Sequence, residues 1–143
     1  MTSIDFYFNA GDRLAIACRL AGKALRQKKR VLVYAPLAEI AQKIDRMLWT
    51  WPAISFVPHC FANDALAAET PVLIAAGEGS PPACEVLLNL AAECPPFFER
   101  HERLLELVAQ DEEERHAGRA RYAYYRDRGY QIRIHDLAGE GRG

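Results

Sequence analysis

The sequence has little of several features that would assign a chain of 143 residues to a class at once. No apolar run approaches the roughly 20 residues that a helix needs to cross a membrane. The first five residues lack the basic stretch that opens an export signal. The net charge is only −1, so there is no overall basic excess of the kind that draws a whole protein to nucleic acid. We therefore expect a cytoplasmic protein with no membrane contact.

Paired cysteines are also missing. Cys18, Cys60, Cys84 and Cys94 are scattered, and no two of them form a C-x-x-C pair. Without an export signal, this pattern favours reduced thiols over disulfides. Cys18 falls on the apolar side of a predicted helix, so we expect it to be a small core residue.

Glycine-rich loops that bind phosphate are absent. The turn after the first predicted strand has one glycine, Gly11, where a dinucleotide fingerprint needs three. Residues 77–79 read Gly-Glu-Gly but lead into Ser-Pro-Pro, and the glutamate would repel phosphate. We interpret this stretch as a surface turn and expect no nucleotide site.

Catalytic and metal-binding patterns are lacking too. His59 and Cys60 are adjacent, but no second pair at metal-ligand spacing accompanies them. The acidic run at 111–114 opens a predicted helix, where the helix dipole already accounts for it. No G-x-S-x-G nucleophile turn occurs. The sequence therefore predicts a protein that is not an enzyme and holds no cofactor or metal.

What the chain does contain is an alternation of strands and helices. Half of the residues are apolar. A strand at 4–8, a helix that starts after the capping residue Asp12, a strand at 31–34 and a helix with apolar positions from 37 to 48 follow in order. This order predicts right-handed crossovers and an α/β, Rossmann-like three-layer fold with a mostly parallel sheet and no nucleotide-binding loop.

The second half is less regular. Strands are possible at 55–58, 71–75 and 86–90, with a loop at 75–82 and a helical turn at 97–100. We expect the last strand at 103–108, followed by a helix at 111–128 that stops at Gly129. These elements predict one domain over residues 1–130 and a partly flexible C-terminal tail over 131–143.

One segment, residues 48–59, gathers aromatics and prolines where the second helix ends. Two tryptophans, a phenylalanine and two prolines occur there, and the prolines prevent further helix. So much aromatic area on a short extended connection is either clamped into the core or offered to a partner. Composition alone favours the core.

The last predicted helix carries a basic and aromatic stripe. Arg115, Arg119, Tyr122 and Arg126 fall at i, i+4, i+7 and i+11. Other arginines and tyrosines flank them at Arg121, Tyr124, Tyr125 and Arg128. Guanidinium groups beside tyrosine rings suit an acidic peptide that ends in a hydrophobic residue and a free carboxylate. Two other readings stay open: a solvated face matched to the helix dipole, or direct binding of single-stranded nucleic acid through the Arg/Tyr face.

Several motifs resemble the chi subunit of bacterial DNA polymerase III holoenzyme. The aromatic segment is similar to the family pattern W-x-x-P-x-x-S-F-x-P-H, with matches at Trp49, Pro52, Ser55, Phe56, Pro58 and His59. Residues 119–130 resemble R-x-R-Y-x-x-Y-R-x-x-G-[FY]. The K-R-V-L at 29–32 and the F-Y at 6–7 also match, so the resemblance extends from near the start to about residue 130.

The resemblance implies an accessory adaptor subunit of the clamp-loader assembly with no known catalytic role and a Rossmann-like fold. It implies two partners: the psi subunit, and the acidic C-terminal tail of single-stranded DNA-binding protein (SSB), which ends in an aromatic residue and its carboxylate. DNA would then be contacted only indirectly. The residues expected to bind the SSB tail are Arg115, Arg119, Tyr122, Arg126 and Val108. The residues expected to bind psi are Trp49, Phe56, Pro58 and His59.

Overall fold

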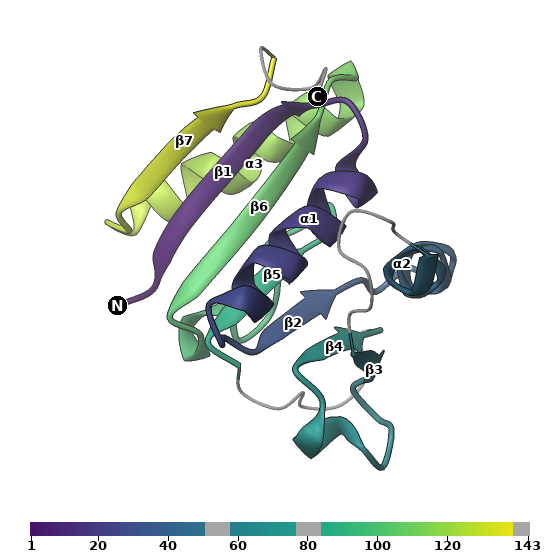
Figure 1. The fold of residues 1–143 in the computed structure, drawn as a ribbon. Helices are drawn as coiled ribbons and strands as arrows, with labels where there is room; N and C mark the ends of the chain where they lie inside the picture. Colours follow the sequence, from purple (N-terminus) through teal and green to yellow (C-terminus); the bar gives the residue numbers. More distant parts are fainter. Residues whose placement is uncertain (51–57, 77–83, 139–143) are drawn as a thin grey trace.

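A computed structural model describes residues 1–50, 58–76 and 84–138. Within these residues the chain forms β-strands, α-helices and short 3-10 helices (η), shown in Figure 1. In chain order they are β1 Ser3–Ala10, α1 Arg13–Arg26, β2 Val31–Tyr34, α2 Ala38–Thr50, β3 His59–Phe61, η2 Ala67–Glu69, β4 Val72–Ala75, β5 Val86–Asn89, η3 Phe98–Arg100, β6 Arg103–Ala109, α3 Glu112–Asp127 and β7 Ile132–Asp136.

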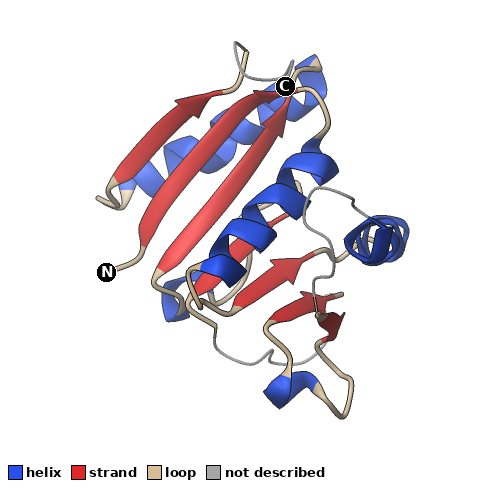
Figure 2. Ribbon diagram, in the orientation of Figure 1, coloured by secondary structure: helices blue, strands red, loops and turns tan. Residues whose placement is uncertain are grey.

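The strands make one sheet in the order β3-β4-β2-β5-β6-β1-β7, and every described pairing is parallel. Helices α1 and α2 cover one face, and α3 covers the other (Figures 1 and 2). The connections through α1 and α2 run across the sheet in one direction, and the connection through α3 runs in the other. Right-handed crossovers in opposite directions place their helices on opposite faces. The predicted three-layer α/β fold is confirmed.

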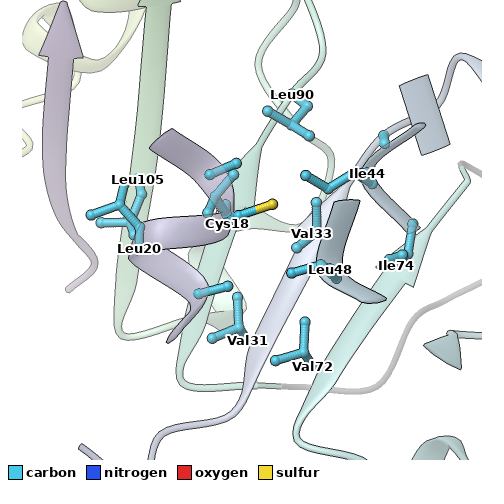
Figure 3. Packing of buried hydrophobic residues seen from close by; sticks show 14 of the residues in the cluster. Cys18, Leu20, Val31, Val33, Ile44, Leu48, Val72, Ile74, Leu90 and Leu105 are labelled. Atoms are coloured by element: carbon cyan, nitrogen blue, oxygen red, sulfur yellow. The ribbon is translucent and has the colours of Figure 1, made fainter. Parts of the chain in front are cut away.

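Two apolar clusters, one on each face of the sheet, form the core. Along β2, Val31 and Val33 pack with α1 and α2 (Figure 3), whereas Leu32 packs with the cluster under α3. A strand buried on both faces explains why residues 31–34 form a short apolar run. Cys18 is completely buried in the first cluster, as expected.

Capping residues set the ends of the helices. The Asp12 side chain accepts a hydrogen bond from the backbone N–H of Ala15 at 3.2 Å, which confirms the predicted cap of α1. Asp111 caps α3 in the same way through the N–H of Glu114. After α3, Gly129 has a φ of +81°, the left-handed conformation expected of a helix stop.

The strand predicted at 103–108 forms as β6, but the prediction that it is the last strand is wrong. Strand β7 follows α3 and pairs in parallel with β1, so residues 132–136 of the segment expected as a tail belong to the sheet. Strand β7 lies at the edge of the sheet, and its five residues are half-buried or exposed, so it lacks the continuous apolar run of central strands such as β2. At the opposite edge, the strand expected at 55–58 lies outside the described residues except for Pro58, and β3 begins at His59. Most of the expected loop at 75–82 also lies outside them.

Candidate functional site

A pocket of about 180 Å³ lies between α3 and the strands β1, β6 and β7. Helix α3 runs behind these three strands in Figure 1. The pocket lining combines apolar and basic side chains from four separate elements. These residues are Phe6, Phe8, Val108, Arg115, Gly118, Arg119, Tyr122 and Ile134.

The floor of the pocket is apolar and closely packed. Phe6 and Val108 are 4% and 5% exposed. Gly118 lets α3 approach β6 closely, because a Cβ atom at this position would lie 2.7 Å from Cγ2 of Val108. Real Cβ contacts are not that short, so any larger residue at 118 would push α3 or Val108 away and reshape the floor.

Two walls face each other across this floor. On the α3 side, Tyr122 meets Phe6 edge-on, with ring centroids 5.6 Å apart and planes at 70°. Such a contact is favourable for aromatic pairs and orients the Tyr122 ring. On the β7 side, Ile134 is 55% exposed. The pocket can therefore take an apolar group between a fixed ring and an aliphatic side chain.

The rim carries positive charge. Arg115 and Arg119 are both exposed. The Nη2 atom of Arg119 lies 3.0 Å from Oε1 of Glu112, and both side chains are mostly in solvent, at 62% and 78% exposure. Ion pairs between such exposed groups contribute little, so a ligand carboxylate can replace Glu112 at low cost. An apolar pocket with guanidinium groups at its edge suits an anion that carries a hydrophobic group.

The structure brings together four of the five residues that the resemblance implies for one peptide site: Val108, Arg115, Arg119 and Tyr122. Arg126 does not line the pocket. Its side chain is exposed and pairs with Asp127 at 3.2 Å. It lies one helical turn beyond Tyr122, on the same side of α3.

Sequence reasoning missed Phe6, Phe8 and Ile134. The alternate placement of Phe6 and Phe8 on the first strand is a usable signal, since alternate residues share one face of a sheet. Ile134 alternates with Ile132 in the same way, but nothing local shows which strand this segment pairs with. It reaches the pocket because β7 pairs with β1 in a register that sets Ile134 beside Phe6.

Two residues predicted to flank the exposed stripe, Arg121 and Tyr125, face the interior instead. Nε of Arg121 lies 2.8 Å from Oε1 of Glu106, and the Tyr125 hydroxyl donates to the other carboxylate oxygen. Asn89 adds a third donor at 3.0 Å. Burial raises the pKa of Glu106, while Arg121 and the hydrogen bonds oppose this. Burial and the Glu106 charge also raise the pKa of Tyr125. These side chains hold α3 on the sheet and are not available to a ligand.

The aromatic segment after α2 is described only in part. Trp49 is 50% exposed, and its ring lies 4.4 Å from that of His59. His59 is buried, with Nε2 3.1 Å from Oδ1 of Asp45. Pro58 is half-buried, and Phe56 lies outside the described residues. Among the described residues predicted to bind psi, Trp49 is exposed and its ring packs against that of His59.

Two other features are absent from the described residues. No cluster of three or more His, Cys, Asp or Glu side chains there could hold a metal ion. Among the helices of residues 1–50, 58–76 and 84–138, none is long and apolar enough to span a membrane.

Comparison with known proteins gives one consistent family. The family described as "DNA polymerase III chi subunit, HolC" matches residues 1–133. The DNA polymerase III subunit chi of Pseudomonas aeruginosa is 35% identical over 96% of this chain and 98% of its own length. Its counterparts in Haemophilus influenzae and Escherichia coli are 30% and 29% identical, and each alignment spans 82% of this chain and at least 80% of the relative. The chain therefore belongs to the DNA polymerase III chi subunit family and has an accessory role in DNA replication.

Proposed function

We propose that this protein is a non-catalytic adaptor of the clamp-loader assembly that links the psi subunit to the acidic C-terminal tail of SSB. Membership of the chi family supports a place in the polymerase complex. The two partners are those that the resemblance to the chi family implies, and the surfaces described above support them. Because such an assembly works on replicating DNA, we also infer a cytoplasmic location.

The pocket beside α3 is the observation that carries the SSB half of this proposal. The expected ligand ends in a residue with an aromatic side chain and a free carboxylate. The apolar floor of the pocket matches the side chain, and the arginine rim matches the carboxylate. The ring would lie over Val108, between Tyr122 and Ile134. The carboxylate would take the place of Glu112 on Arg119 and form parallel N–H bonds with its guanidinium.

Two further arginines would attract the acidic residues that precede the terminal one. Arg115 stands at the pocket rim, and Arg126 lies a turn beyond Tyr122. Charges of this kind speed association and add affinity that weakens with salt. We expect Arg126 to act through its charge and Arg115 through closer contact.

The psi half rests on the exposed ring of Trp49, with His59 packed beneath it. We assign psi binding to Trp49, Phe56, Pro58 and His59. Strand β3, next to this segment, ends one side of the sheet order, and β7, which lines the pocket, ends the other (Figure 1). Partners bound at opposite edges of one sheet would not compete for the same surface, which is what an adaptor requires.

A crossed binding experiment tests both halves. Titration calorimetry would use a short acidic peptide that ends in Pro-Phe with a free carboxylate, and co-elution would follow psi. Arg119→Ala should weaken peptide binding by about 2 kcal/mol or more, because it leaves the carboxylate without its partner, and should retain psi. Trp49→Ala should retain the peptide and lose psi.

Each variant is the folding control for the other, since both replace exposed side chains. An amidated peptide is the matched ligand control, and it should bind as weakly to the wild type as the free peptide binds to Arg119→Ala. Equal affinity for amidated and free peptide would refute the carboxylate role of Arg119. Failure of the folded wild type to bind the free peptide would refute the SSB half altogether, and undiminished psi binding by Trp49→Ala would refute the psi assignment.

A further inference from the structure

Strand β7 forms one wall of the pocket, yet it is an edge strand of five residues with little apolar burial of its own. Among the described strands it pairs only with β1, and none of its five residues is fully buried. Successive side chains of a strand point to opposite faces. Ile132 and Ile134 face the α3 side, and Arg133 and His135 face the α1 side.

On the α1 side, β7 is attached through a buried carboxylate. Asp5 of β1 is completely buried. Its oxygens lie 2.9 Å from Nε of Arg133 and 3.0 Å from Nε2 of His135, and Arg103 of β6 approaches at 2.7 Å. Burial opposes ionisation of Asp5, but the hydrogen bonds from these three side chains outweigh it and lower its pKa. The His135 ring also stacks on Tyr7, with centroids 4.4 Å apart.

The register between β1 and β7 connects this attachment to the pocket. Asp5 pairs with Arg133, Phe6 with Ile134, and Tyr7 with His135. Ile134 is thus flanked in the chain by the two residues that are tied to Asp5 and Tyr7. Both members of the middle pair, Phe6 and Ile134, line the pocket. Charged contacts on one face of β7 thereby set the position of an apolar wall on the other face.

We propose that Ile134 determines the size of the apolar side chain that the pocket accepts, and that Asp5, through Arg133 and His135, is the positioning residue that holds Ile134 in place. This inference rests on the proposed binding of an acidic peptide with a hydrophobic C-terminal residue. It adds a determinant of selectivity that lies apart from the arginines of α3, because Ile134 lines the pocket from another element, β7.

The selectivity of the pocket can be measured with three acidic peptides that differ only in the last residue, Phe, Leu or Trp. Ile134→Ala widens the pocket and should weaken binding of the Phe peptide about tenfold, as is typical for lost methyl contacts in an apolar pocket. The preference for the Trp peptide over the Phe peptide should rise at least about fivefold. Ile132→Ala is the matched control, since it removes the same group from the same face of β7 outside the pocket lining. It should leave the preference unchanged.

The positioning role is tested by the double variant Arg133→Ala/His135→Ala. Asp5 keeps Arg103 as a partner in this variant, so the buried carboxylate is not left without a counter-charge. The loss of a surface arginine lowers the affinity for all acidic peptides alike. The decisive quantity is therefore the ratio of the affinities for the Trp peptide and the Phe peptide. This ratio should shift toward Trp as in Ile134→Ala, and hydrogen exchange should accelerate in β7 but not in β2 or β5. The variant Arg133→Lys/His135→Gln retains donors to Asp5 and should restore the ratio.

The outcomes separate this inference from the proposed function. If the folded wild type binds none of the three peptides, the proposed function fails and the inference fails with it. If the wild type binds but Ile134→Ala keeps the wild-type ratios, Ile134 is not the determinant of size. If Ile134→Ala shifts the ratios and the double variant does not, the positioning role of Asp5 is refuted.

Discussion

Two arginines of α3, only two residues apart, lie in opposite environments. Arg119 is 62% exposed and pairs with Glu112 at 3.0 Å, whereas Arg121 is 3% exposed and pairs with Glu106 at 2.8 Å. The two distances are nearly equal, but their energetic meaning differs. Water screens the first pair, while the second holds two charges where an unpaired one would be very costly. Arginine therefore makes a surface contact at position 119, whereas at position 121 it attaches the helix to the sheet.

Two tyrosines of α3 likewise lie on different faces of the helix. Tyr122 lines the pocket, and Tyr125 is completely buried with its hydroxyl on Glu106. The outer face of α3 can change its contacts without cost to the fold, and the inner face cannot. A substitution on each face should therefore affect a different measurement.

The largest effect is expected on the inner face. Arg121→Ala leaves the Glu106 carboxylate buried without its cation and should lower the free energy of unfolding by about 3–5 kcal/mol. Urea denaturation measures this, with the exposed Arg126→Ala as the control, expected to change stability by less than about 1 kcal/mol. Similar stability of the two variants would contradict the division between the faces.

A smaller effect is expected at the boundary between the faces. Gly118→Ala places a Cβ against Val108 and should cost about 1–3 kcal/mol from overpacking, partly offset by about 1 kcal/mol from the better helix propensity of alanine. In the double variant with Val108→Ala the clash is relieved. A double-mutant cycle on stability should therefore give a coupling energy of about 1 kcal/mol or more. Additive effects would mean that Gly118 is not needed for this close approach.

The smallest effect is expected on the outer face. Glu112→Gln removes the internal competitor for Arg119 and should strengthen binding of the acidic peptide by about 0.2–1 kcal/mol. Calorimetry would compare it with Glu113→Gln, which changes the same charge in the same helical turn. An equal gain in both variants would attribute the effect to overall charge and not to release of Arg119.

Local chemistry made much of the fold predictable. The caps at Asp12 and Asp111 and the stop at Gly129 depend on hydrogen bonds and backbone angles within a few residues. The apolar run at 31–34 predicts a strand buried on both faces for the same reason. The chi motifs likewise pointed to the family that the comparisons confirm.

The helical spacing of Arg115, Arg119 and Tyr122 determined that these side chains share one side of α3, because that relation is set by the helix repeat alone. Only the tertiary structure decided what lies opposite them. Phe6 and Ile134 are separated by most of the chain and meet through the parallel register of β1 and β7. It also decided that Arg121 faces inward, because the Glu106 carboxylate that holds it belongs to another element. Sequence determines the contacts that depend on local repeat and capping, and the packing of distant elements determines which of those side chains remain available to a partner.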